Sequence, residues 1–263
     1  MDGNNTVVIR LLGRFSVEYC GRVLMEPEGV RESQSWRLLK YLCVNYKSAT
    51  DMDELTKALC LDCGDVNVWN TIRVRLRRTR AILDRVGLGD SQNGLLLYGA
   101  GKYWINHDLE LLVDTGEVER LFALAQNPAH PETLRLAESL SAIGLYRGRF
   151  LALSEPSSRT DAIRERYDLI YSRLVEFSLA LMAQTGNYKG APSVCDSLLR
   201  VSPLDVRLHC LILKTLLSAG LVGESATYYS RVAVALANTG AELPDFMSLM
   251  SEAKAKVKPG GTA

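Results

Sequence analysis

The sequence has no apolar run long enough to cross a membrane as a helix. Such a helix needs about 20 mostly apolar residues, and the longest apolar stretches here, such as LVEFSLALMA, end at about half that length. The N-terminal stretch, MDGNNTVVIR, also lacks the basic start and apolar core of a secretory signal peptide. We therefore expect a cytoplasmic protein with no membrane partner.

Side chains that hold metals or catalyse reactions are also scarce. The three histidines, His107, His130 and His209, are scattered, and of six cysteines only Cys60 and Cys63 have C-x-x-C spacing. A structural zinc site needs a second pair of ligands, so this spacing indicates a metal or redox role only weakly. The sequence contains no P-loop, G-x-G-x-x-G, H-E-x-x-H or G-x-S-x-G motif. It therefore predicts no enzyme, no cofactor and no metal, with structural roles for His130 and His209.

The N-terminal part contains short strand and helix patterns. Residues 7–25 alternate between apolar and polar side chains and break at two glycines, which predicts three antiparallel strands with tight turns. Apolar residues at helical spacing predict a helix in SQSWRLLKYLCVNY, with Ser33 or Ser35 as the N-cap. A second helix should follow Asp51, because Glu54 lies three residues further on, as in a capping box.

A third segment, WNTIRVRLRRTRAIL, holds five arginines and no acidic residue, although the whole chain has a net charge of +1. On a helical wheel the segment forms one continuous buried stripe, which consists of Trp69, Ile72, Leu76, Thr79, Leu83 and Val86. The opposite face carries Asn70, Val74, Arg77, Arg78 and Ala81. Arg73 and Arg80 fall on one flank of that face, and Arg75 falls on the other.

This charge pattern indicates an anionic partner. A solvated helix usually mixes charges of both signs, because opposite charges four residues apart stabilise it. Five like charges repel one another unless an anion such as a phosphate backbone is near. Arginine and asparagine also make bidentate contacts to guanine and adenine in the major groove. Nucleic-acid binding is therefore the favoured interpretation, and a solvated or partner-facing helix is the alternative.

The stretch NGLLLYGAGKYWIN predicts a β-hairpin after the basic helix. Gly99 and Gly101 should permit the tight turn, and Lys102 lies near the tip, where it would meet a phosphate. Tyr103 and Trp104 alternate, so one of them should pack inward. An ordinary hairpin with a solvated lysine is the alternative. Two helices, a basic third helix and a hairpin follow one another in the order of a winged helix-turn-helix.

Strand signals end near residue 114, and the chain from there to about residue 253 is predicted to be helical. Two segments in this part each contain a helix, a glycine turn and a second helix, and their glycines, Gly186 and Gly220, are 34 positions apart. This spacing is the period of tetratricopeptide repeats, and Pro203 separates the two units. Because about three repeats are needed for stability, helices before residue 165 should complete the stack.

The charges divide in the same way. Residues 1–106 hold 15 basic and 12 acidic residues, a net charge of +3, whereas residues 107–263 hold 16 and 18, a net charge of −2. The sequence therefore predicts a mostly α-helical chain with a small β component. We expect a winged helix-turn-helix domain at 1–106, followed by an all-α tetratricopeptide-like bundle at 114–253.

From about Val7 to Phe246, the chain resembles SARP-type bacterial transcriptional activators. VIRLLGRFSVEYCGRVL, SWRLLKYLCVN, ELTKALC, NTIRVRLRRTRAIL and GLLLYGAGKYWIN follow the order of the family's OmpR-type winged helix. LYRGRFL, ERYDLIYSRLVEFSLALMAQTGNYKGA, LLRVSPLDVRLHCLILKTLLSAG and ANTGAELPDF match its bacterial transcriptional activator domain. Four positions depart from the family pattern: Arg73 replaces a glutamine, Arg75 a histidine, Thr79 a leucine and Cys60 a tryptophan.

The resemblance implies a sequence-specific DNA-binding activator that binds promoter-proximal repeats and helps to recruit RNA polymerase. We expect a homodimer at least on DNA. The predicted DNA-binding residues are Asn70, Arg73, Val74, Arg77, Arg78, Arg80 and Lys102. In the helical half, the residues expected to line a concave face are Tyr188, Tyr228 and Tyr229, although at least one of them should belong to the core. The alternative function is a tetratricopeptide scaffold for protein partners with only non-specific nucleic-acid binding.

Overall fold

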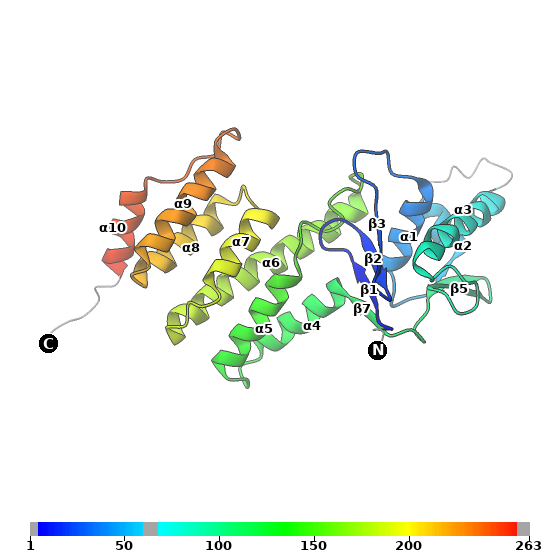
Figure 1. Cartoon of the computed structure of the whole chain (residues 1–263), viewed down its shortest axis with the longest axis horizontal. Coiled ribbons are helices and arrows are strands. Elements are labelled where there is room, and N and C mark those ends of the chain that lie inside the picture. Colours follow the sequence, from blue (N-terminus) through cyan, green and yellow to red (C-terminus); the bar gives the residue numbers. More distant parts are fainter. Residues whose placement is uncertain (1–4, 60–67, 257–263) are drawn as a thin grey trace. The chain divides into compact units, whose positions relative to one another are not determined.

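The computed structural model describes residues 5–59 and 68–256, which form two compact units (Figure 1). The first unit holds Met1–Gly116 and Phe150–Thr160, and the second holds Glu117–Arg149 and Asp161–Ala263. Helices dominate and the sheets are small, which confirms the predicted fold class. The domain limits 1–106 and 114–253 stay a prediction. The first compact unit also includes residues 107–116 and a segment that lies much later in the chain.

A four-stranded sheet opens the first unit. Its strands are β1 (Val7–Arg10), β2 (Ser16–Tyr19), β3 (Arg22–Met25) and β7 (Leu111–Val113), in the order β3-β2-β1-β7. The first three strands are antiparallel neighbours, as the alternating pattern predicted. The sequence did not predict β7, which pairs in parallel with β1. A three-residue strand whose partner lies far away in the sequence leaves too weak a local signal.

Three helices and a second sheet complete the winged helix-turn-helix. The helices are α1 (Gln34–Val44), α2 (Met52–Ala58) and α3 (Val68–Leu83), followed by the 3-10 turn η1 (Asp84–Val86). The strands β4 (Thr50–Asp51), β5 (Leu96–Gly99) and β6 (Lys102–Ile105) form a sheet in the order β4-β6-β5. Ser33 is the N-cap of α1, and Asp51 and Glu54 form the predicted capping box of α2.

Asp114 ties the end of β7 to β1. Its carboxylate accepts hydrogen bonds from the backbone N–H groups of Leu11 and Leu12, each at 2.9 Å. Burial raises the pKa of Asp114 to about 6, although these hydrogen bonds and the charge of Arg10 act in the opposite direction. The sheet is therefore fastened by a carboxyl group that titrates at mildly acidic pH.

Residues 150–160 belong to the first unit, although the chain before and after them belongs to the second. The backbone N–H of Leu151 donates to Leu11 O at 2.8 Å, and that of Ala152 donates to Gly13 O at 2.9 Å. Phe150 forms an isolated β-bridge with Leu12 and is buried. This segment therefore extends the sheet region, and the first unit is not continuous in sequence.

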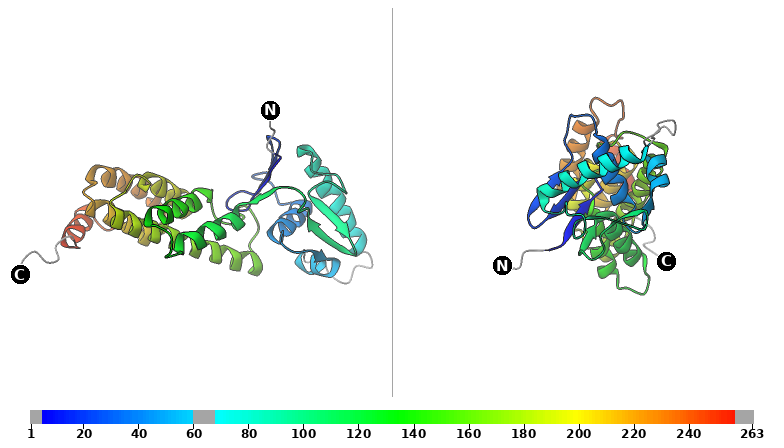
Figure 2. Two further views of the ribbon diagram at one scale, coloured as in Figure 1. Left: turned by 90° about the horizontal axis from the view of Figure 1, so that it is seen from below. Right: turned by 90° about the vertical axis from the view of Figure 1, so that its right-hand side faces the viewer.

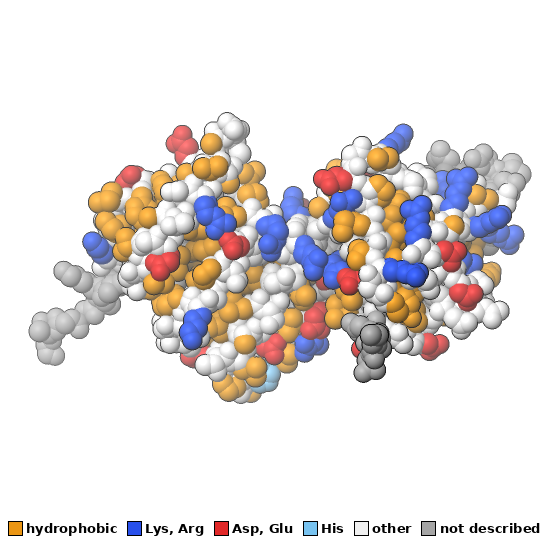
Figure 3. All heavy atoms as spheres, in the orientation of Figure 1, with side chains coloured by type: hydrophobic (Ala, Val, Ile, Leu, Met, Phe, Trp, Pro, Cys, Tyr) orange, Lys and Arg blue, Asp and Glu red, His pale blue; other side chains and the backbone are white. Residues whose placement is uncertain are grey.

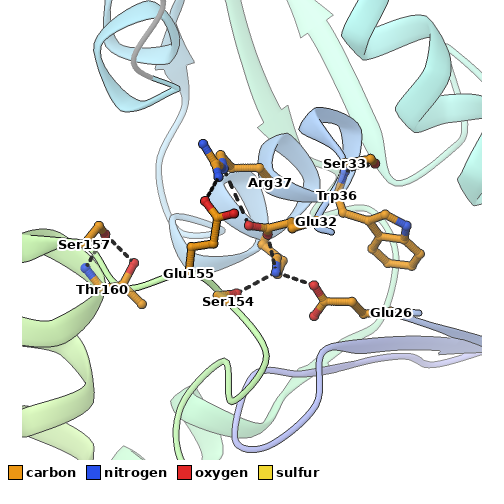
Figure 4. A network of polar contacts seen from close by, with 10 residues as sticks. Glu26, Glu32, Ser33, Trp36, Arg37, Ser154, Glu155, Ser157 and Thr160 are labelled. Atoms are coloured by element: carbon orange, nitrogen blue, oxygen red, sulfur yellow. Dashed lines mark hydrogen bonds and ion pairs between the residues drawn. The ribbon is translucent and has the colours of Figure 1, made fainter. Parts of the chain in front are cut away.

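A buried polar network fastens the same segment to α1 (Figure 4). The ammonium of Lys40, which is 3% exposed, donates to Glu26 at 2.6 Å and to the Ser154 hydroxyl at 2.5 Å, and it also pairs with Glu32. Arg37 pairs with Glu32 at 3.5 Å and with Glu155 at 2.5 Å. Folding therefore removes the carboxylates of Glu26 and Glu32 and the ammonium of Lys40 from water together. Lys40 is the buried cation that both carboxylates share.

The second unit consists of helices (Figures 1 and 2). They are α4 (Asp114–Gln126), α5 (Glu132–Leu145), α6 (Ser158–Thr185), α7 (Ala191–Val201), α8 (Val206–Ser218), α9 (Val222–Leu236) and α10 (Phe246–Lys256); α4 and α6 begin within the first unit. Gly186 ends α6 and Gly220 follows α8, with φ angles of 66° and 79° in the left-handed region. The two predicted helix–glycine–helix repeats are therefore α6–α7 and α8–α9.

His209 lies inside the second repeat. It is fully buried; its Nδ1 lies 2.6 Å from the Tyr228 hydroxyl and its Nε2 lies 3.0 Å from Pro203 O. Burial lowers the pKa of His209, which favours the neutral ring. Tyr228 is also buried, whereas Tyr229 is half-buried and donates to Pro244 O at 3.2 Å. His209 and Tyr228 are therefore core residues of the second repeat, which agrees with the structural role predicted for His209.

Other expectations concern metals and membranes. Cys60 and Cys63 lie outside the described residues. Within the described ranges, no group of three or more His, Cys, Asp or Glu side chains is placed to hold a metal ion. In the same part of the chain, no helix combines the length and apolar character that a membrane span needs.

Candidate nucleic-acid interface

The inner face of α3 anchors the helix to the rest of the first unit. Ile72, Leu76 and Leu83 are each at most 2% exposed, as the wheel predicted. Thr79, which stands where the resembled family has leucine, is fully buried, and its hydroxyl donates to Ser35 O of α1 at 3.1 Å. This hydrogen bond satisfies a polar group in the core and fixes α3 against α1.

The outer face of α3 is exposed and basic. The exposed residues predicted to contact DNA on this face are Asn70, Arg73, Val74, Arg77 and Arg78. The helix contains no acidic residue, and Arg73, Arg77 and Arg78 form no ion pair with any other described residue. Figure 3 shows basic side chains gathered over this helix. We call these five residues the outer face of α3.

Arg75 and Arg80 differ from the arginines of the outer face. Arg75 is half-buried, and burial together with the nearby charge of Arg37 lowers its pKa. Arg80 is also half-buried and donates to Leu96 O of β5 at 3.2 Å, which ties α3 to the hairpin. Arg80 is therefore partly committed to the fold, although it remains beside the outer face.

The hairpin β5–β6 has the predicted wing arrangement, with one correction. Ala100 and Gly101 form the turn with φ angles of 48° and 79°, whereas Gly99 does not adopt a positive φ. A Cβ atom at Gly99 would lie 3.0 Å from the ring of Trp104, so this position favours glycine through close packing. Lys102 is exposed beside the turn.

The two faces of the wing differ. Tyr103 is 6% exposed and packs inward, and its ring lies 4.5 Å from that of Tyr98, its partner across the strands. Trp104 is half-buried, and strand alternation places it with Lys102 on the opposite face. Tyr103 is therefore the inward residue of the predicted pair, and Lys102 points away from the face that carries the two tyrosines.

A groove of about 660 Å³ lies between α3 and the wing. Its basic lining consists of Arg73, Arg77 and Arg80, and its wing side consists of Tyr98 and Tyr103. Ser91 and Gln92 from the loop before β5 also line it. Tyr98, Ser91 and Gln92 are not among the residues predicted from the sequence, because their approach to α3 depends on tertiary packing. The one signal in the sequence is the aromatic residue near the end of the first hairpin strand, and the structure shows that Tyr98 is 52% exposed.

A turn capped by the side chain of Asp90 holds the loop before β5 in place. The Asp90 carboxylate accepts hydrogen bonds from the backbone N–H groups of Gln92 and Asn93 at 2.8 and 2.6 Å. These hydrogen bonds favour the charged carboxylate and so lower the pKa of Asp90. Gln92 is exposed and is therefore presented to the groove by a structured turn.

Comparisons with known proteins agree with this architecture. The family model described as "Bacterial transcriptional activator domain" matches residues 113–243. The structure is similar to a solved structure titled "Mycobacterium tuberculosis EmbR in complex with low affinity phosphopeptide", with a TM-score of 0.56 and 14% sequence identity. The match covers 97% of this chain and 66% of that chain, so this chain spans just under two thirds of that relative. No curated protein sequence matches it.

These findings bear on different parts of the chain. At 14% identity the likeness to EmbR shows the fold, and it extends over both units. The family match falls on the helical part, from the last residue of β7 through α9. A winged helix-turn-helix thus precedes a recognised activator domain, in the order that the sequence predicted. Residues 113–243 belong to the bacterial transcriptional activator domain family, which agrees with the resemblance to SARP-type bacterial transcriptional activators.

Proposed function

We propose that the protein binds duplex DNA sequence-specifically, with the outer face of α3 in the major groove. The observation that carries this proposal is the set of exposed arginines on that face with no carboxylate partner among the described residues. Unpaired like charges on a rigid helix favour a polyanion. The hairpin after α3 supplies the wing that a winged helix-turn-helix places near the adjacent backbone.

The geometry suggests a division of roles. Asn70, Arg77 and Arg78 are exposed on the outer face and can make bidentate contacts to base edges. Arg73 lines the groove beside the wing together with Arg80, where a phosphate would meet both guanidinium groups. These assignments make α3 both the reader of the sequence and part of the backbone clamp.

Two further residues complete the proposed contacts. Val74 is 42% exposed in the middle of the basic face, where an apolar side chain can contact the methyl group of thymine. Lys102 stands at the wing tip and would meet a phosphate of the neighbouring backbone. Both contacts follow from placement beside the arginines, and each is weaker than a bidentate base contact.

Activation is proposed to need more than one copy and a second partner. A single winged module buries only about 600–1,000 Å² on DNA, so two copies on adjacent repeats would roughly double the contacts. The helical hairpins of the second unit offer surfaces for a second copy or for RNA polymerase. We therefore propose a promoter-proximal activator that binds as a homodimer on DNA and helps to recruit RNA polymerase.

The DNA-binding proposal is tested by site selection followed by substitution. Duplexes bound by the full chain are selected from a random pool, and affinities are measured by fluorescence anisotropy for the preferred site and for single-base variants. Arg77→Ala and Arg78→Ala should each cost about 1–3 kcal/mol on the preferred site if the residue reads a base. Arg22→Ala, which removes an exposed arginine from β3, is the matched control and should bind normally.

The outcomes separate three interpretations. A loss at one base position only identifies a base contact, whereas an equal loss on all sequences identifies a phosphate contact. Unchanged binding of both variants contradicts the role of α3. If selection yields no preferred site and binding is weak, the protein is better described as a tetratricopeptide scaffold with non-specific nucleic-acid binding.

The activation proposal needs a test that leaves the first unit intact. A chain that ends near residue 110 lacks β7 and the segment 150–160, both of which pair with the β1 region. Its failure would therefore report damage to the first unit. In vitro transcription from a selected site should instead use the full chain with substitutions on exposed positions of α9, such as Val234→Glu (78% exposed). If no exposed position of the second unit affects transcription while DNA binding persists, the second unit has no role in activation.

A further inference from the structure

The second unit contains a hollow of about 1020 Å³ between its two helical repeats. The hollow is lined by the turn before α7 and its first residues, by the end of α8 and by the first part of α9. Its floor is apolar and includes Cys195, Leu216 and Tyr228, each at most 5% exposed. It lies entirely within one compact unit, and none of the proposed DNA contacts takes part in it.

Small side chains keep this space open. Gly223, in the first turn of α9, lines the hollow, and a Cβ atom there would find nothing within 4 Å. Ala191 and Ala219 line it from the start of α7 and the end of α8. Close-packed repeats normally interdigitate larger side chains at such a junction. The accessible apolar side chains of the hollow are therefore those of Tyr188, Pro192 and Leu221, which line it above the buried floor and are half-buried or exposed.

The rim carries two basic side chains, Lys189 and Arg231. Lys189 is exposed and pairs with no described carboxylate. Arg231 pairs with Asp196 at 2.7 Å, but both side chains are at least half exposed, so the pair is weak and leaves guanidinium N–H groups free. Glu224 is the one carboxylate of the lining. Lys189 and the free N–H groups of Arg231 are therefore the hydrogen-bond donors that the rim offers to an anionic group.

We propose that this hollow binds a small amphipathic organic anion. The volume is at the upper end of the roughly 300–1,000 Å³ typical of small-ligand pockets, which are mostly apolar with a few polar groups. The apolar body of the ligand lies on Tyr188, Pro192 and Leu221. Its carboxylate, sulfonate or phosphate group meets Lys189 and Arg231 at the rim.

The test uses two fluorescent probes on the full chain. 8-Anilinonaphthalene-1-sulfonate has an apolar body and an anionic group, and N-phenyl-1-naphthylamine has nearly the same body without the charge. Both should bind saturably, and the sulfonate should bind more tightly. Gly223→Leu fills the hollow and suits a helix, so it should weaken the saturable binding of both probes at least about tenfold.

Matched variants locate the binding and separate its two parts. Gly144→Leu makes the same change in α5, where a Cβ also meets open space, and should leave both affinities unchanged. Lys189→Gln and Arg231→Gln should each weaken the sulfonate roughly threefold and leave the uncharged probe unchanged. Circular dichroism melting confirms that each variant is folded.

Three results would overturn the proposal. One is the absence of saturable binding by either probe, which would leave the hollow to a polypeptide partner. Another is binding that survives Gly223→Leu or is lost equally in Gly144→Leu. The third is an equal effect of the charge substitutions on both probes, which would remove the anionic requirement. DNA affinity does not enter these measurements, so their outcome is independent of the proposed function.

Discussion

Arginines have opposite surroundings in the two units. In the second unit, several exposed arginines have carboxylate partners: Arg149 pairs with Asp168 at 2.5 Å, and Arg166 pairs with Glu119 at 2.9 Å. On the outer face of α3, Arg77 and Arg78 are equally exposed, yet they pair with no described carboxylate. The charges of these paired arginines are neutralised within their own unit, whereas those of α3 remain available to a partner.

This comparison shows why the net charge of the whole chain is uninformative. The net charge of the chain is close to zero, because acidic residues elsewhere offset the positive charge of the outer face of α3. The first unit also contains the opposite extreme, since Lys40 is buried with two carboxylates. Charges thus occur in three environments: unpaired and exposed, paired and exposed, and paired and buried. Their energetic contributions should differ accordingly.

The largest effect on stability is expected from the buried network. Lys40→Ala would leave Glu26 buried without a counter-ion and Glu32 with only its longer pair to Arg37, which should lower the free energy of unfolding by about 3–5 kcal/mol. Denaturant titration of the full chain measures this loss. The combination of Lys40→Met with Glu26→Gln and Glu32→Gln should recover most of it. A loss below about 1 kcal/mol for Lys40→Ala would show that the network is effectively solvated.

A pH-dependent effect is expected from Asp114. Burial raises its pKa from the ordinary 3.8 to about 6, so the folded state holds this proton more tightly than the unfolded state. The resulting contribution to stability is complete below pH 4 and is lost as the pH rises through 6, by roughly 3 kcal/mol. Unfolding free energies of the natural chain and of Asp114→Asn, measured from pH 4 to 7, should diverge in that direction. Parallel curves would contradict the assignment.

The wing should have a smaller and purely electrostatic effect. Lys102→Ala should lower the slope of log affinity against log salt by about one if Lys102 meets a phosphate. Arg120→Ala removes one charge from the second unit, where Arg120 pairs with Glu117 at 2.6 Å, and is the control. Equal slopes for Lys102→Ala and the natural chain would make the wing an ordinary hairpin with a solvated lysine.

The smallest effect is expected where arginines are paired and exposed. Arg166→Ala should lower the free energy of unfolding by less than about 1 kcal/mol, because solvent screens its pair with Glu119. Denaturant titration measures this value. A loss as large as that of Lys40→Ala would remove the distinction between exposed and buried pairs.

Local signals in the sequence predicted much of the first unit. The caps at Ser33 and Asp51 depend on residues three positions away, and the buried stripe of α3 depends on helical periodicity. The helix–glycine–helix repeats also follow from spacing alone. These features need no knowledge of distant contacts, which is why a single sequence contains them.

Features that depend on distant contacts could not be predicted. The pairing of β7 with β1 and the return of residues 150–160 join segments far apart in the sequence. No local signal in the sequence marks Lys40 as a buried residue, because its partner Ser154 lies far along the chain. The approach of Tyr98 to α3 has the same origin. The predicted DNA contacts themselves stay a prediction, because the structure contains no DNA.

The most direct test of the central proposal removes three arginines from each environment. One full-length variant carries Arg73→Ala, Arg77→Ala and Arg78→Ala, and the other carries Arg149→Ala, Arg166→Ala and Arg207→Ala, so that the net charge changes equally. On the selected duplex, the account predicts at least about a 100-fold loss of affinity for the first variant and less than about threefold for the second. Equal losses in the two variants, or unchanged binding by the first, would contradict it.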